Sequence, residues 1–95
     1  MRRTKEHVVN EIAAMLAVEA PPMSTGATEP KAIFVLVNEG LGLGLDSQTR
    51  KEDLARGIVE ASGAVWGADC ESRGGTVTMK GLESVVKAVR FYLGR

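Results

Sequence analysis

Apolar residues recur every three or four positions near the start of the chain, and this spacing predicts an amphipathic helix. Val8, Ile12 and Leu16 fall on one face of such a helix. Thr4 is a suitable N-cap, and two consecutive prolines follow the last apolar position. We therefore predict a first helix from Thr4 to about Val18.

Residues 19–29 are rich in helix breakers and predict a long connecting loop. The apolar run over 32–37 that follows suits either a helix or a buried strand, because half of its residues are β-branched. Thr28 suits the cap of a helix, Pro30 suits its first turn, and Leu41 continues the helical spacing. We predict a second helix here, with a strand as the alternative.

Glycine and leucine alternate over residues 40–45. A nucleotide-binding glycine loop needs a preceding strand and a helix at a fixed offset, and neither is evident in the sequence. We therefore predict a flexible turn whose leucines dock on the core. Thr49 and Glu52 then have the spacing of a capping box, and Gly63 suits a left-handed helix end, so a central helix is predicted over 50–62.

A glycine pair follows Arg73 and separates two short segments, 68–71 and 76–79. Such a pair readily supplies the positive φ angles of a two-residue turn, so we predict a β-hairpin here. Apolar spacing then predicts a final helix that begins at Thr78 or Met79. Its apolar stripe consists of Leu82, Val85, Val86, Val89 and Leu93.

These elements predict an α+β fold that is mainly helical, with a three-helix core, a hairpin and an appended final helix. The length of 95 residues predicts one domain, 1–95, with a core of ordinary size for a small protein. Only four residues are aromatic, so the core is expected to be aliphatic. The longest apolar run, over 32–37, is far shorter than the roughly 20 residues that span a bilayer. We expect a cytoplasmic protein that does not contact membranes.

No constellation in the sequence points to catalysis, to a metal or to a cofactor. Glu29 and Lys31 have the spacing of some metal-dependent nucleases, but no upstream aspartate accompanies them. The single cysteine, Cys70, lies between two acidic residues, which disfavour a reactive thiolate, and His7 is remote from it in sequence. We therefore predict that the chain is not an enzyme.

Basic residues cluster on and after the central helix, although 12 basic and 12 acidic residues cancel over the whole chain. The proposed phosphate-contacting stripe consists of Arg50, Lys51, Arg56, Arg73 and Lys80. The alternative is that these are ordinary solvated charges offset by acidic neighbours. Glu52 and Arg56, for example, have the spacing of a helix-surface ion pair.

The order of helix, helix, glycine-rich turn, helix and a hairpin tipped by Arg73 resembles a winged helix-turn-helix domain over about residues 4–79. In that family the third helix enters the DNA major groove, and the hairpin, called the wing, contacts the backbone or the minor groove. The resemblance implies a non-enzymatic module that binds or targets double-stranded DNA. Arg50, Lys51 and Arg56 would then lie on the recognition helix and Arg73 on the wing.

The phrases Thr28–Lys31 and Glu71–Thr78 are also similar to accessory segments of bacterial restriction endonucleases. This second resemblance implies a DNA-targeting module whose catalytic part lies elsewhere.

A different class of function is a small protein-interaction or homodimerisation domain. Trp66, Phe91 and Tyr92 are the residues that could form its contact surface, because aromatic residues are enriched in interface hot spots. The alternative is that all three complete the core. An exposed strip of Phe91, Tyr92 and Leu93 would favour an interaction domain, whereas a contiguous basic patch would favour DNA binding.

Overall fold

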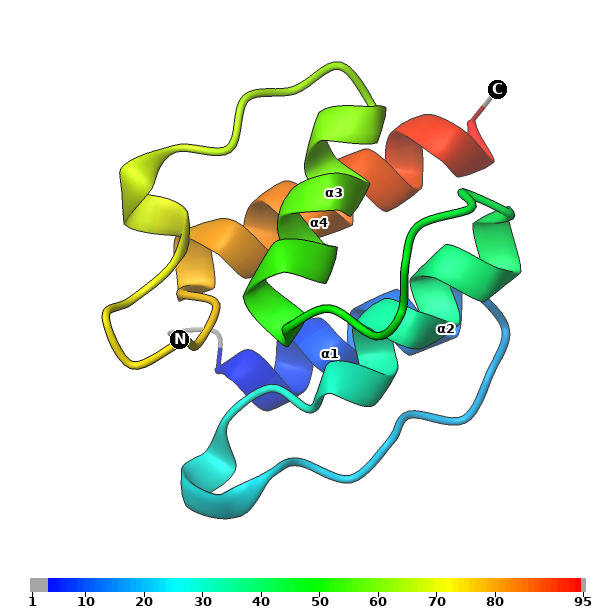
Figure 1. Ribbon diagram of the computed structural model, residues 1–95. Helices are drawn as coiled ribbons and strands as arrows, with labels where there is room; N and C mark the ends of the chain where they lie inside the picture. Colours follow the sequence, from blue (N-terminus) through cyan, green and yellow to red (C-terminus); the bar gives the residue numbers. More distant parts are fainter. Residues whose placement is uncertain (1–3, 95) are drawn as a thin grey trace.

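The computed structural model describes residues 4–94, and four α-helices form a closed cycle in which each helix packs on two others (Figure 1). The first helix contacts the second and the fourth, and the third also contacts the second and the fourth. The helices are α1 (Lys5–Met15), α2 (Lys31–Leu41), α3 (Lys51–Ala61) and α4 (Met79–Leu93), with short 3₁₀ turns η1 (Thr25–Ala27) and η2 (Ala68–Cys70).

The predicted α+β fold and its hairpin wing are wrong, because residues 4–94 contain helices and no β-strand. The segment before α4 makes only one isolated bridge, between Glu71 and Val77, around a tight turn. The second predicted arm cannot extend this bridge because Thr78 already caps α4, its hydroxyl accepting from the N–H of Gly81 at 3.2 Å. The first predicted arm instead coils into η2, which packs against α4.

Four predicted helices are confirmed near their expected positions, including the ambiguous run over 32–37, which is helical. The first is shorter than expected and ends at Met15, because Ala17 adopts a left-handed conformation with φ of 57°. Its predicted cap is confirmed: the Thr4 hydroxyl accepts from the N–H of His7 at 3.2 Å. The second helix is capped by Pro30 and not by Thr28.

The capping box predicted at Thr49 does not form. The N-cap of α3 is Arg50, and the Thr49 hydroxyl donates to the carbonyl of Asp46 at 2.9 Å. The side chain of Glu52 turns inward and is buried. At the other end of α3, Gly63 has the predicted left-handed conformation, with φ of 91°.

The core is aliphatic, as predicted, and Phe34 is its one fully buried aromatic among the described residues. The buried face of α4 contains four of the five predicted stripe positions, and Leu93 is half-exposed. Burial of these faces against one another stabilises the cycle of helices, since each buried aliphatic side chain contributes about 1.5–3 kcal/mol.

The glycine–leucine segment is fixed by one buried side chain. Asn38 of α2 donates from Nδ2 to the carbonyl of Leu45 at 2.8 Å and accepts from the N–H of Leu45 at 2.9 Å. Leu41, Leu43 and Leu45 pack against the core, which confirms the predicted docking of the three leucines. The segment therefore serves as a structural connector between α2 and α3.

Candidate functional site

The predicted basic stripe does not form one surface, because Lys51 is directed into the molecule. Its side chain is only 20% exposed, and its ammonium group lies 3.2 Å from the buried carboxylate of Glu29. It also donates to the backbone carbonyl of Glu29 at 3.0 Å. Lys51 is therefore unable to reach an external phosphate in this conformation.

Arg50, the N-cap of α3, and Arg56, within α3, are exposed, but each is paired with an acid of that helix. The guanidinium of Arg50 donates to Asp53 at 3.1 Å, and this hydrogen bond raises the pKa of Arg50. Arg56 pairs with Glu60 at 3.3 Å, so the predicted pairing of Arg56 with Glu52 does not occur. The paired carboxylate partly cancels the positive electrostatic potential of each arginine.

Of the last two predicted residues, Arg73 lies in the turn before α4 and Lys80 lies in the first turn of α4. Lys80 donates to Asp69 at 2.5 Å, and this hydrogen bond lowers the pKa of Asp69 and raises the pKa of Lys80. Arg73 is exposed in the tight turn and makes no ion pair with another described residue. Of the five predicted contacts, Arg73 is thus the one that is both exposed and unpaired within residues 4–94.

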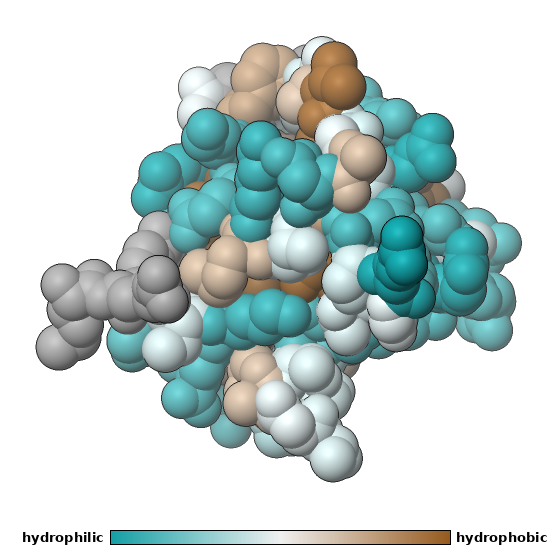
Figure 2. Space-filling view, turned by 90° about the vertical axis from the view of Figure 1, so that its left-hand side faces the viewer, coloured by the Kyte–Doolittle hydropathy of each residue, from teal (hydrophilic) through white to brown (hydrophobic). Residues whose placement is uncertain are grey.

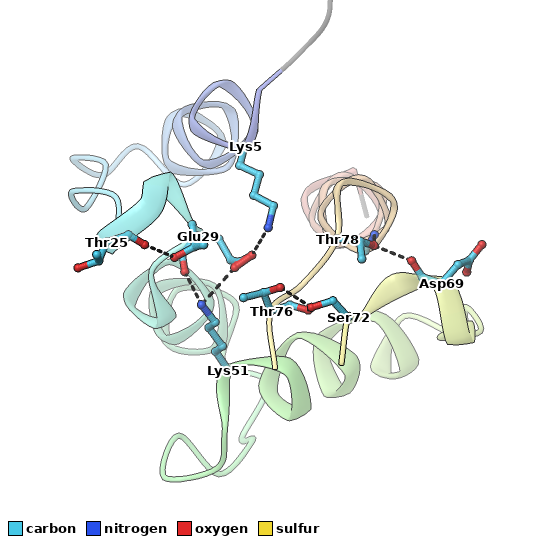
Figure 3. A network of polar contacts seen from close by, with 10 residues as sticks. Lys5, Thr25, Glu29, Lys51, Asp69, Ser72, Thr76 and Thr78 are labelled. Atoms are coloured by element: carbon cyan, nitrogen blue, oxygen red, sulfur yellow. Dashed lines mark hydrogen bonds and ion pairs between the residues drawn. The ribbon is translucent and has the colours of Figure 1, made fainter. Parts of the chain in front are cut away.

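Two buried carboxylates, those of Glu52 and Glu29, lie near the amino end of α3. Glu52 lies against the turn: a methyl group added at Gly75 would stand 2.7 Å from its Oε2 atom, so the turn packs directly on this side chain. Glu29 is fully buried, with Lys5 of α1 at 2.9 Å on Oε1 and Lys51 of α3 at 3.2 Å on Oε2. Figure 3 shows the two lysines approaching Glu29 from opposite sides and from different helices.

The Glu29 cluster was not predicted from the sequence. The burial of Glu29 depends on the meeting of α1, α2 and α3, whose starts are far apart in the sequence. The available signal was weak: a single acidic residue directly before Pro30, at the end of a breaker-rich loop.

Apolar side chains remain exposed at the C-terminal end of α4. Phe91 is 51% exposed and Leu93 is 49% exposed, whereas Tyr92 is half-buried. The rings of Phe91 and Tyr92 meet edge to face, with centroids 5.5 Å apart and planes at 77°. Of the three residues whose exposure would favour an interaction domain, Phe91 and Leu93 are exposed and Tyr92 is not fully exposed.

Trp66 does not belong to the exposed strip. It is partly buried against the core, and its indole N–H donates to the carboxylate of Glu71 at 2.8 Å. Its neighbour Val65 is 86% exposed in the segment between α3 and η2. The side of the molecule that carries η2 is mostly hydrophilic, with hydrophobic atoms gathered at its upper edge (Figure 2).

The remaining candidates for chemistry have structural surroundings. Cys70 is buried, and its Sγ atom lies 3.9 Å from the hydroxyl of Ser84. His7 takes part in the cap of α1. Within residues 4–94 no group of acidic, histidine and cysteine side chains is arranged to hold a metal ion. No helix in the same range has the length and apolar character needed to cross a bilayer.

Comparison with known proteins finds no family model, no curated protein and no solved structure that matches the chain.

Proposed function

We propose that the chain is a small protein-interaction domain that associates with a second copy of itself through the C-terminal end of α4. The observation that supports this proposal is the half-exposure of Phe91 and Leu93. Leu82, Val85, Val86 and Val89 of the same helix are buried. Exposed aromatic groups beside charged ones are typical of interface hot spots.

The contact with a second copy follows from the spacing of side chains on α4. Lys87 is exposed and lies four residues before Phe91, on the same face of the helix. If two copies of α4 cross in antiparallel fashion about a two-fold axis between these positions, Phe91 of each copy meets Lys87 of the other. The ammonium group can then lie over the aromatic ring, and the contact repeats identically in both copies.

The charge of the chain is compatible with such an association. Its basic and acidic residues are equal in number, so two copies carry no net charge that would repel them. Lys87 places one positive charge beside Phe91, although the chain as a whole has no excess of positive charge. Electrostatics therefore permits self-association, and the apolar area of Phe91 provides its driving force.

Sedimentation velocity over a range of protein concentrations tests the proposal. Burying the exposed half of Phe91 contributes roughly 2 kcal/mol per copy. Because Phe91→Ser is present in both copies, it is expected to weaken association about a thousandfold. Val65→Ser is the control, because Val65 is a more exposed apolar residue outside α4. A monomeric wild type, or equal weakening by the two substitutions, would contradict the proposal.

Binding of double-stranded DNA is the second candidate function, and it is supported by the exposure of Arg50, Arg56, Arg73 and Lys80. Three of these side chains are held by carboxylates, and a phosphate would have to share or displace those partners. Exposed ion pairs contribute only about 0–1 kcal/mol, so breaking one of them to contact a phosphate costs little free energy. The paired charges nevertheless support DNA binding less than the exposed apolar strip supports self-association.

A further inference from the structure

Glu29 connects two helices that do not pack extensively on each other. The helices form a cycle in which α1 and α3 lie at opposite corners, and within residues 4–94 these two are not a closely packed pair. Lys5 is the first residue of α1, Lys51 is the first residue of α3, and Glu29 comes two residues before α2. One carboxylate therefore links the starts of two helices across the cycle (Figure 3).

The link is almost entirely removed from solvent. The side chain of Glu29 has no exposed surface, and those of Lys5 and Lys51 are 24% and 20% exposed. Lys5 donates to Oε1 of Glu29 at 2.9 Å, and the ammonium group of Lys51 lies 3.2 Å from Oε2. Oε2 has no hydrogen-bond partner in the described part of the chain, so it depends on the charge of Lys51.

The exposed ion pairs of the molecule connect residues that are already held together. The pairs formed by Arg50 and Arg56 stay within α3 and its cap. The pair of Arg90 with Glu11 joins α4 to α1, and these two helices pack on each other. The Glu29 cluster differs from both kinds, because it is largely buried and joins opposite corners of the cycle.

A buried ion cluster responds strongly to the loss of one member. Moving charges out of water costs about as much free energy as their attraction returns, so replacing a complete buried cluster with apolar side chains is often neutral. Loss of one member is different, because the remaining groups stay buried without their partner. Without Glu29 the two ammonium groups share no counter-charge, and without Lys5 the Oε1 atom loses its donor.

We propose that Glu29 is an electrostatic latch that couples the docking of α1 to the docking of α3. The latch acts as a unit of three side chains and specifies how the starts of these helices meet, while the apolar core supplies the stability. None of its residues belongs to α4, and the latch does not depend on self-association.

Thermal melting of variants tests whether the three side chains act as a unit. The single variants are Glu29→Gln and Lys51→Met, and a complete replacement combines Lys5→Met, Glu29→Met and Lys51→Met. Lys31→Met is the matched control for the lysines, because Lys31 is the first residue of α2 and forms no ion pair with another described residue. Glu39→Gln is the control for Glu29, because Glu39 is exposed and the change in net charge is the same.

We expect Glu29→Gln and Lys51→Met each to lower the melting temperature by about 10–20 °C, because each leaves buried groups without a partner. The two controls should shift it by at most about 4 °C. The complete replacement should melt within about 5 °C of the wild type, although it removes all three charged groups.

Amide hydrogen exchange tests the coupling between the helices. Lys5→Met changes only α1, yet it should accelerate exchange about tenfold at Leu54 and Ala55 in α3, and more than at Val89 in α4. Lys31→Met should leave these rates unchanged. Unaltered exchange in α3 of Lys5→Met would contradict the proposed coupling.

Additive losses, in which the complete replacement melts below both single variants, would overturn the proposal. So would single variants that melt like their controls. If both single variants fail to fold, the complete replacement decides the outcome: a folded protein supports the latch, and an unfolded one contradicts it.

Discussion

Gly81 stands where α4 comes closest to η2, and replacing it with alanine is the sharpest test of how the segment before α4 is folded. A methyl group at position 81 would lie 2.2 Å from the carbonyl oxygen of Cys70 and 2.7 Å from Cγ1 of Val77. The first of these is a backbone atom, and it is held by a hydrogen bond from the N–H of Thr78 at 2.9 Å. It cannot move aside as a flexible side chain would.

The size of the effect follows from two opposing contributions. Alanine favours a helix over glycine by about 1 kcal/mol. Overpacking of this kind costs about 1–3 kcal/mol, and here η2 must also separate from α4, which exposes buried Cys70 and Val77. We expect Gly81→Ala to lose about 2 kcal/mol of unfolding free energy, or roughly 8–16 °C of melting temperature.

Gly40 provides the matched control. It lies inside α2, and a methyl group there would meet only Cδ2 of Leu16, at an ordinary contact distance of 3.5 Å. Gly40→Ala is therefore expected to stabilise the protein by up to about 1 kcal/mol. Urea denaturation can be followed by the fluorescence of Trp66, the single tryptophan. If Gly81→Ala were as stable as the wild type, the close packing of η2 on α4 would be refuted.

Three further predictions concern the polar contacts. Asn38→Ala should cost about 2 kcal/mol in urea denaturation, because the N–H and carbonyl of Leu45 lose their partner. The hydrogen bond from Lys80 lowers the pKa of Asp69 in the folded protein. The stabilisation from this pair is therefore fully present above the ordinary aspartate pKa of about 4, and it is lost as the pH falls through the lowered pKa of Asp69 in the folded state. In Lys80→Ala, an NMR titration should show a higher Asp69 pKa than in the wild type. If DNA is bound, anisotropy should show Arg73→Ala lowering the salt slope by about one, and an unchanged slope would exclude this contact.

The helices were predictable from sequence because each carries a repeated apolar face, and such faces form helices in almost any surrounding structure. The six-residue run over 32–37 was ambiguous by itself, and the continuation of its spacing to Leu41 identified it correctly. The helix ends were less predictable. Ala17 ends α1 in a left-handed conformation that no local signal for alanine indicates.

The hairpin was mispredicted because its local signals were satisfied in another way. Gly75 does adopt a positive φ, 78°, and a tight turn does form between Glu71 and Val77. Thr78, however, was assigned to a strand although it caps α4, and this tertiary role stops the pairing of strands. The β-propensity of residues 76–78 is a weak guide to structure here, because α4 begins at Met79.

The candidate sites were only partly predictable. Phe91 was predicted to lie on a contact surface because aromatic residues are enriched in interface hot spots, and its side chain is exposed. Lys51 was assigned to a surface that it does not reach, since the acid that captures it, Glu29, is 22 residues away in sequence. A contact between such distant residues depends on how whole helices pack, and it produces no periodic pattern in the sequence.

Self-association through α4 can be detected by recording amide NMR spectra of the wild-type protein across a dilution series. We predict concentration-dependent shifts that are largest at Lys87, Phe91 and Leu93 and small in α2, with a single dissociation constant describing all of them. Spectra that do not change with concentration, or shifts concentrated at Arg50 and Arg73, would contradict the claim.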